Sequence, residues 1–428
     1  MKYQALNTAL FEDNRKRFTD KMEANTLAIF HSNDEMPRNG DCFYVFRQHS
    51  DIFWLSGIDQ EQSILLLYPD HPLESMRAVL FLRKTNEHIA IWEGHKYTKP
   101  EAEETSGISS IYWLEDFDNV YKSLMNRCSA VYLNTNENDR AITEVETRDR
   151  RFIKTLKEEY VGHDILRAAP VLRDLRAIKN QHEIEVMQEA CNITDKAFRR
   201  VLGFVKPGVM EYQVEAEVIH EFISNRANGH AYTPIVASGA NACCLHYVDN
   251  NDECKAGDLL LMDFGSEYGN YASDLTRTIP VSGKFTNRQK DVYNAVLRVM
   301  KKAEELLVVG KTLTQYHQEV GEYMSDQLVG LGLISEEEVK NQDPKWPAYK
   351  KYFMHGTSHH IGLDVHDVGD RLAPIQAGMV FTIEPGIYIP EEDMGIRIEN
   401  DYLVTDNGLV DLMKNIPITV EEIEELMA

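Results

Sequence analysis

The stretch Leu259–Pro280 reads LLLMDFGSEYGNYASDLTRTIP, and its pattern predicts two aspartates facing each other across a hairpin. The Gly-Asn dipeptide at its centre, between two apolar runs, is typical of a tight turn between antiparallel strands. A turn directly after Tyr268 places Asp263 opposite Asp274 on one face, with their carboxylates about 5 Å apart. At an effective dielectric constant near 20 their repulsion is roughly 3 kcal/mol. The pair therefore needs a shared proton, a cation or full solvation.

A second acidic pair follows the same logic near the end of the chain. Val380–Thr405 reads VFTIEPGIYIPEEDMGIRIENDYLVT, which is two apolar strands joined by a polar loop. A turn centred on residues 391–392 places Glu384 opposite Glu399. Two facing acidic pairs in one domain are hard to explain as ordinary packing, so together they predict a cation site.

The segment Met354–Gly369, MHGTSHHIGLDVHDVG, offers the nitrogen ligand that the acids lack. Two Asp, two Glu and one His form an oxygen-rich set that suits manganese, cobalt, iron or zinc. Four anionic ligands favour two divalent ions about 3.5 Å apart, bridged by two carboxylates. We expect Gly356 and Gly362 to permit close backbone approach. Spacing leaves four candidate histidine ligands: His355, His359, His360 and His366. The sequence contains no HExxH motif, so a zinc site carried on one helix is not indicated.

Composition narrows the class of protein. The 428 residues are enough for two domains, and 43% hydrophobic residues can bury full cores. The net charge of -24 argues against a nucleic-acid partner. No apolar run approaches the roughly 20 residues of a membrane span, and the first residues lack a signal-peptide core. The six cysteines form no CxxC pair, which favours reduced thiols in a cytoplasm.

The pattern divides the chain near Ala168–Pro170. Residues 1–170 alternate short apolar runs with polar helical segments, which predicts a self-contained α/β domain. Its predicted strands are Thr26–Ser32, Phe43–Gln48, Ser63–Pro69, Ala78–Arg83 and Ala130–Asn136, and its predicted helices include Asp118–Arg127 and Ala141–Glu159. Residues 171–428 predict the order helices, hairpin, helices, hairpin, an internal duplication in outline. The predicted helices here are Gln181–Phe204, Glu211–Asn228, Arg288–Val309 and Thr314–Leu331; the predicted strands are Leu259–Phe264, Tyr271–Pro280, Val380–Ile389 and Gly395–Thr405.

The motifs MDFG, SDLTRT, HGTSHHIGLDVHD, TIEPGIYI and GIRIEND, in this order, resemble the metal-site motifs of the M24B metallopeptidases, and within them the Xaa-Pro aminopeptidase (aminopeptidase P) group. FWLSGI in the first domain extends the resemblance over nearly the whole chain. It implies an α/β creatinase-type N-terminal domain, residues 1–170, followed by an α+β "pita-bread" catalytic domain, residues 171–428.

Five metal ligands follow from the resemblance. They are Asp263, Asp274, His359, Glu384 and Glu399, with Asp274 and Glu399 bridging the ions. The implied cofactors are two divalent metal ions. Mn2+ is the expected metal, and Co2+ or Zn2+ are the alternatives.

The resemblance also implies a reaction, hydrolysis of the bond between the first residue and a proline in second position. Glu384 would carry the proton to the proline nitrogen. The residues expected to serve catalysis beside it are His246, His355, His366 and Arg397. Substrate contacts are expected from Tyr232, which walls the proline pocket, and from His246 and His366. Tyr388 lies four residues after Glu384 and is either a partner of the site or structural.

Several alternatives share these features. A prolidase would keep every ligand and accept only dipeptides. A methionine aminopeptidase would share the catalytic half but not the first domain. A non-catalytic peptide-binding module on the same fold is a remote alternative, because such relatives have lost the ligands and this chain keeps all five. The resemblance further implies a homo-oligomer, a dimer or tetramer, with the first domain at the contacts. Trp54, Trp92 and Trp113 are candidates for such contacts, or for the core of that domain.

Overall fold

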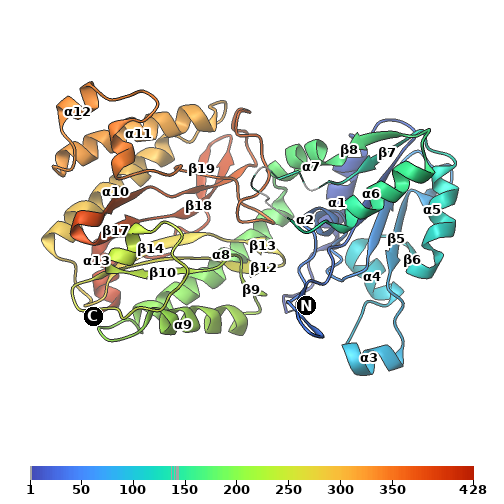
Figure 1. Cartoon of the computed structure of the whole chain (residues 1–428), viewed down its shortest axis with the longest axis horizontal. Helices are drawn as coiled ribbons and strands as arrows, with labels where there is room; N and C mark the ends of the chain where they lie inside the picture. The colour runs from blue at the N-terminus through green and yellow to red at the C-terminus, as the bar shows by residue number, and fades with distance from the viewer. Residues whose placement is uncertain (1, 136, 139, 141–143) are drawn as a thin grey trace. The chain divides into compact units, whose positions relative to one another are not determined.

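The computed structural model describes residues 2–135, 137–138, 140 and 144–428. The chain forms two compact units, Ala5–Arg176 and Ala177–Ala428, and the second also includes Lys2–Gln4 (Figure 1). The division falls six residues after the expected boundary at 170. The reason is helix α7, Ala168–Ala177, whose Arg176 forms a 2.7 Å ion pair with Asp51 of the first unit. No helix among the described residues is long and apolar enough to cross a bilayer.

The first unit is built on a six-stranded sheet in the order β6-β5-β4-β1-β7-β8. The strands are β1 Thr26–His31, β4 Ile64–Leu67, β5 Ala78–Leu82, β6 Ser110–Trp113, β7 Ala130–Leu133 and β8 Asp164–Arg167, with the small hairpin β2 Pro37–Asn39 and β3 Cys42–Phe43 apart from them. The helices are α1 Thr8–Thr19, α2 Ser50–Ser56, α3 Glu87–Glu93, α4 Lys99–Ser106, α5 Phe117–Met125, α6 Arg148–Glu159 and α7.

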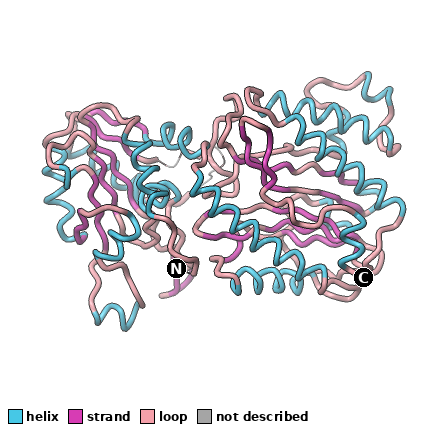
Figure 2. Tube along the Cα trace, turned by 180° about the vertical axis from the view of Figure 1, so that it is seen from behind, coloured by secondary structure: helices cyan, strands magenta, loops and turns pink. Residues whose placement is uncertain are grey.

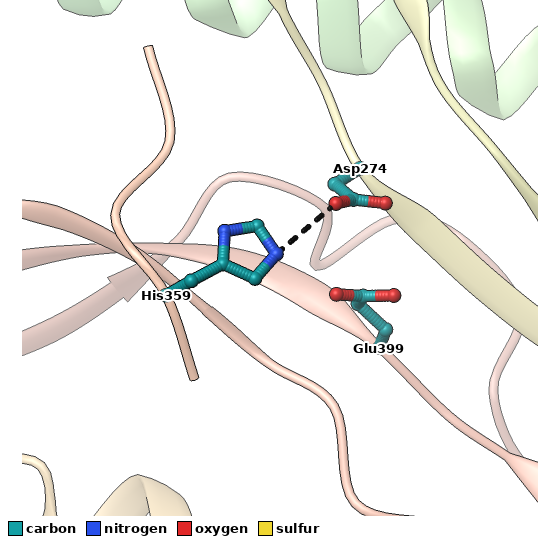
Figure 3. A group of neighbouring side chains, drawn as sticks. All are labelled: Asp274, His359 and Glu399. Atoms are coloured by element: carbon teal, nitrogen blue, oxygen red, sulfur yellow. Dashed lines mark ion pairs between the residues drawn. The ribbon is translucent and has the colours of Figure 1, made fainter. Parts of the chain in front are cut away.

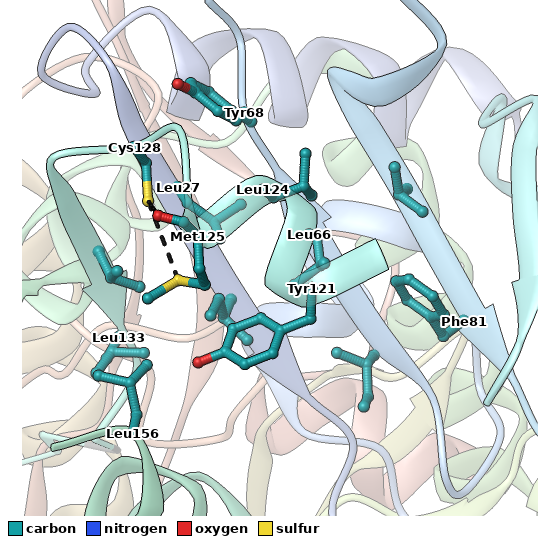
Figure 4. Close-up of a cluster of buried hydrophobic side chains, with 14 of the residues drawn as sticks. Leu27, Leu66, Tyr68, Phe81, Tyr121, Leu124, Met125, Cys128, Leu133 and Leu156 are labelled. Atoms are coloured by element: carbon teal, nitrogen blue, oxygen red, sulfur yellow. Dashed lines mark hydrogen bonds between the residues drawn. The ribbon is translucent and has the colours of Figure 1, made fainter. Parts of the chain in front are cut away.

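A buried core joins this sheet to α5 and α6. Leu27, Leu66 and Phe81, from three neighbouring strands, belong to one buried cluster with Leu124 of α5 and Leu156 of α6 (Figure 4). Burying each of these side chains contributes about 1.5–3 kcal/mol. The strands that supply the core are the ones that alternation and apolar runs predicted.

Three sequence expectations for this unit fail or change. The predicted strand Phe43–Gln48 is wrong: only Cys42–Phe43 pairs, and Val45 is 95% exposed, because no sheet face lies beneath this segment. Strands β6 and β8 were not predicted. The helix expected over 141–159 begins at Arg148, where Thr147 accepts from the Arg150 N–H; residues 141–143, like Asn136 at the end of a predicted strand, lie outside the described residues.

The second unit has the expected order of helices and hairpins. In Figures 1 and 2 its strands lie between two helix pairs, α8 with α9 and α10 with α11. Its helices are α8 Gln181–Leu202, α9 Glu211–Ser224, α10 Asn287–Leu306, α11 Leu313–Gly330, α12 Glu336–Lys340 and α13 Val420–Leu426. Its strands are β9 Gly229–His230, β10 Ile235–Ser238, β11 Leu259–Phe264, β12 Ser266–Tyr268, β13 Tyr271–Ala272, β14 Leu275–Pro280, β15 Val380–Ile383, β16 Gly386–Ile389, β17 Met394–Arg397, β18 Asn400–Thr405 and β19 Gly408–Asp411.

The first hairpin has a different register from the predicted one. Tyr268 pairs with Tyr271, so Gly269 and Asn270 form the two-residue turn, with φ of 56° and 64°. Positive φ at both positions is what a type I′ turn requires. Asp263 therefore lies opposite Thr276 rather than opposite Asp274. Because the error is two residues and the side-chain period is two, Asp274 keeps its predicted face.

The second hairpin has the predicted register. Ile383 pairs with Asn400 in the β15–β18 ladder, and Gly386 pairs with Arg397 in the β16–β17 ladder. Both ladders continue one register, which places Glu384 level with Glu399 in the short gap between them.

Candidate metal centre

Three of the predicted ligands converge in one buried cluster. One donor atom each of Asp274, His359 and Glu399 lies within 4.8 Å of the others. His359 Nε2 is 3.4 Å from Asp274 Oδ2, and Figure 3 shows the imidazole edge turned toward both carboxylates. The three residues come from three separate segments: the link after β13, the 354–369 segment and the gap before β18.

The other two predicted ligands border this cluster. Glu384 Oε1 lies 3.8 Å from His359 Nε2. The Tyr232 hydroxyl oxygen lies 2.6 Å from Asp263 Oδ1 and 2.5 Å from Asp274 Oδ1. A phenol has one proton, so it can donate to only one of these two carboxylates at a time. All five donors predicted from the sequence are thus neighbours.

The electrostatics of the cluster show uncompensated negative charge. Burial, and then the Asp263 carboxylate, raises the pKa of Asp274 well above its usual value. Burial, and then Asp274, does the same to the pKa of Glu399. Crowded carboxylates with one imidazole are the donor set of oxygen-preferring divalent cations, so the residues present fit such ions.

The imidazole of His359 is oriented by the backbone. Its Nδ1 lies 2.9 Å from the carbonyl oxygen of His360, which can only accept, so the geometry places the proton on Nδ1. Nε2 then carries the lone pair and faces the acids, as a metal ligand requires.

A chain of polar groups supports the acids from behind. Arg397 donates from Nη2 to Asp263 Oδ2 at 2.6 Å, from Nη1 to the Tyr388 hydroxyl at 2.8 Å and from Nε to Thr276 Oγ1 at 3.1 Å. Thr276 in turn donates to Glu399 Oε2 at 2.6 Å. One guanidinium is therefore linked to acids of both hairpins, and Tyr388 is a partner of the site.

The remaining predicted histidines differ in placement. His355 Nδ1 lies 2.8 Å from the Gly356 carbonyl and 3.6 Å from Glu384 Oε2, while its Nε2 lies 2.8 Å from the Tyr388 hydroxyl. Burial, and then Arg397, lowers the pKa of His355 to about 3, so the ring is neutral. The His366 ring lies 4.5 Å from the His359 ring, edge to face. His246 is exposed, after the 3-10 turn Gly239–Cys243, and makes no hydrogen bond to the acids of the described cluster.

Two site partners escaped sequence reasoning, and one glycine expectation was wrong. Thr276 and Asp401 each lie two residues after a predicted ligand, so strand alternation was a usable signal. Asp401 Oδ2 accepts from the Asp274 N–H at 3.0 Å. Gly362 does permit a close approach, since a Cβ there would lie 2.2 Å from a carboxylate oxygen. Gly356 does not, because a Cβ there would meet nothing within 4 Å.

Comparison with known proteins agrees with this geometry. Residues 185–406 match the model of metallopeptidase family M24, and residues 11–132 match that of the aminopeptidase P N-terminal domain. The chain belongs to metallopeptidase family M24, a family of hydrolases. It is 34% identical to the Xaa-Pro aminopeptidase of Haemophilus influenzae, over 97% of this chain and 96% of that protein. It is also 34% identical to the Xaa-Pro aminopeptidase of Escherichia coli, over 97% of each.

A solved structure extends the similarity to three dimensions. Zinc-substituted Escherichia coli aminopeptidase P, in complex with product, superposes with a TM-score of 0.89 at 32% identity, covering 99% of each chain. The match spans both units, so the α/β N-terminal domain and the α+β catalytic domain expected from the sequence are confirmed.

Proposed function

We propose that this protein is an Xaa-Pro aminopeptidase, which hydrolyses the bond between the first residue of a peptide and a proline in second position. The observation that carries the proposal is the cluster of Asp274, His359 and Glu399, flanked by Asp263 and Glu384. Support comes from relatives that bear this name and match nearly the whole chain.

The five clustered residues would hold two divalent ions. Asp263 would serve one ion, His359 and Glu384 the other, and Asp274 and Glu399 both. When bound, such ions lower the pKa of water and polarise the scissile carbonyl. Manganese is the proposed metal, because four of the five ligands are carboxylates. Metal analysis of the purified protein, and melting temperatures with Mn2+, Co2+ and Zn2+ each added to the chelated protein, test this choice.

Side chains around the acids would handle the substrate and the proton. Glu384 is the most exposed acid of the cluster, with its side chain 20% exposed, so it is the one placed to take a proton and deliver it to the proline nitrogen. The exposed His246 would donate a hydrogen bond to a carbonyl oxygen as it becomes negative. The neutral His355, 3.6 Å from Glu384, would help to orient the scissile peptide, because its one N–H is already donated to the Gly356 carbonyl. His366 would contact the peptide beside His359.

Tyr232 and Arg397 would shape this site from its walls. The Tyr232 hydroxyl lies against two of the acids, and its ring would then bound the proline pocket. Arg397 balances the negative charge of Asp263 and acts on the substrate only through the groups it holds.

The proposal is tested with one dipeptide and with two tripeptides that are matched in length and charge. The chelated protein, reloaded with Mn2+, is given an Xaa-Pro dipeptide, an Xaa-Pro-Yaa tripeptide and an Xaa-Ala-Yaa control, and products are followed by mass spectrometry. Release of Xaa from the Pro tripeptide but not from the Ala tripeptide supports an Xaa-Pro aminopeptidase. Turnover of the dipeptide alone would identify a prolidase. Turnover of none would refute both.

Two variants make the test specific to the cluster. Glu384→Gln should lose activity by at least about 100-fold, since it removes a proton carrier and a ligand. Tyr212→Phe is the matched control: Tyr212 is 53% exposed on α9, and its variant should retain full activity. Equal loss in both would show that the assay reports folding instead of chemistry.

The proposal includes a homo-oligomer, a dimer or tetramer, formed through the first unit. The support is large apolar side chains left in water on that unit: Val45 is 95% exposed, Ile91 and Trp92 78% each, and Tyr44 61%. Trp54 is fully buried, so it belongs to the core instead. Light scattering across a concentration series should give more than one chain's mass, and Trp92→Ser should reduce it.

We place the protein in the cytoplasm. All six cysteines are free thiols in the structure, as expected in a reducing compartment. Fractionation of the source cells, with the peptide assay applied to each fraction, tests this placement.

A further inference from the structure

Lys179 and Asp367 form a buried ion pair that the reaction does not use. Lys179 Nζ lies 3.0 Å from Asp367 Oδ2, and the two side chains are 1% and 2% exposed. Removing two charges from water costs much of what their attraction gains, so such a pair is a poor device for stability alone. Its position in the fold indicates what else it does.

The pair packs directly on the backbone of the 354–369 segment. At Gly362 a Cβ would lie 2.2 Å from Asp367 Oδ2 and 3.0 Å from Lys179 Cε, so only glycine leaves room for the pair. Lys179 is itself fixed, because its N–H donates to the Gly378 carbonyl at 2.8 Å, just ahead of β15. The segment is thereby tied to a strand of the sheet.

One carbonyl connects the pair to the metal cluster. The Asp367 N–H donates to the His360 carbonyl oxygen at 2.9 Å. His359 Nδ1 donates to the same oxygen, also at 2.9 Å. The ion pair fixes the side chain of Asp367, and the backbone N–H of the same residue holds the His360 carbonyl. The carbonyl holds the imidazole, and His359 Nε2 is left facing Asp274, as Figure 3 shows.

We infer that Lys179 and Asp367 are positioning residues that fix His359 as a metal ligand through the His360 carbonyl. This inference rests on the proposed role of His359 as a ligand. Both residues act through the backbone, because the link to His359 runs through the Asp367 N–H and the His360 carbonyl.

The test measures metal binding rather than turnover. Mn2+ is titrated calorimetrically into the chelated protein, and the visible spectrum is recorded after loading with Co2+. Asp367→Asn and Lys179→Met should each weaken Mn2+ binding 10- to 100-fold and change the Co2+ spectrum, because a ligand loses its support. The double variant should bind Mn2+ no more weakly than the weaker-binding single variant, because both substitutions break the same ion pair. Asp367→Glu, which keeps the charge, serves if the amide variant does not fold.

A buried ion pair elsewhere in the chain provides the control. Arg176 and Asp51 are 2.7 Å apart, with side chains 4% and 10% exposed. Asp51→Asn should lower the melting temperature but leave Mn2+ affinity within twofold of wild type. If Asp367→Asn also leaves the affinity within twofold, or Asp51→Asn weakens it equally, the inference is overturned.

A separate variant distinguishes this failure from that of the proposed function. His359→Ala should lose Mn2+ affinity whatever the ion pair does. Unchanged affinity in His359→Ala would refute the ligand set itself. Loss in His359→Ala with none in Asp367→Asn would refute only the positioning role.

Discussion

Replacing Asp274 with asparagine should stabilise the metal-free protein. Asp263 and Asp274 each have an oxygen within hydrogen-bond distance of the one Tyr232 hydroxyl, so these oxygens are at most about 5 Å apart. At an effective dielectric constant of 20 their repulsion is about 3 kcal/mol. Losing a charge-assisted hydrogen bond offsets about 2 kcal/mol of this. The net gain is about 1 kcal/mol, or roughly 2 °C in melting temperature for a unit of this size.

The assay is thermal unfolding at pH 8 in excess chelator, repeated with Mn2+. With metal at a hundred times its dissociation constant the wild type should gain about 2.7 kcal/mol, whereas Asp274→Asn should gain almost nothing. The order of stability should therefore reverse: the variant is more stable without metal, and the wild type is more stable with it.

Glu211 provides the same chemical change in the opposite setting. Its buried carboxylate accepts from the Ser238 and Asp252 N–H groups and from Asn241 and Tyr247. Glu211→Gln places an amide donor against two of these donors and should cost about 2–3 kcal/mol. If Asp274→Asn destabilises the metal-free protein as Glu211→Gln does, the carboxylates of Asp263 and Asp274 do not repel each other as described, and the prediction is refuted.

Three further outcomes are expected. Burial lowers the pKa of His230 to about 4, so between pH 6.5 and 4 this histidine binds a proton more readily in the unfolded chain than in the folded one. The free energy of unfolding of the wild type should therefore fall by up to about 3 kcal/mol as the pH falls through this range. His230→Phe should lack this part of the loss, measured by urea unfolding of the chelated protein at pH 6.5 and at pH 4. Gly265→Ala would place a Cβ 1.6 Å from the Ser273 carbonyl oxygen and should lower the melting temperature severely, whereas Gly356→Ala has open space and should not. Thr276→Val removes a donor to a cluster carboxylate and should weaken Mn2+ binding about 10-fold by calorimetry, and unchanged affinity would contradict this.

Strand parity explains why the acids could be predicted although one register could not. The turn was placed one residue too early, which moved the partner of Asp263 by two positions. An even error preserves the face, so Asp274 still met the site; an odd error would have sent it to the opposite face. At the second hairpin the predicted register of Glu384 and Glu399 was correct, because the tip Pro390–Asp393 is centred on residues 391–392, where the turn was placed.

The features that were missed depend on contacts between distant segments. Lys179 and Asp367 are 188 positions apart, and neither has a local pattern that names the other. Tyr232 was expected to bound a pocket, and its hydroxyl contact with Asp263 and Asp274 depends on how β10 meets β11. The segment that begins at Phe43 misled for the opposite reason. It resembles a strand locally, but among the described residues its pairing with β2 ends at Phe43.

The register of the second hairpin also has a practical consequence for anyone who wants to attach something to this enzyme. Because one ladder lies on each side of Glu384 and Glu399, their separation is set by paired backbone and does not depend on the length of the tip at Pro390–Asp393. The tip is exposed, and Asp393 there has a positive φ of 48°. A fluorophore or an affinity peptide inserted at this tip would lie one hairpin length from Glu384 and Glu399 and would leave their separation unchanged.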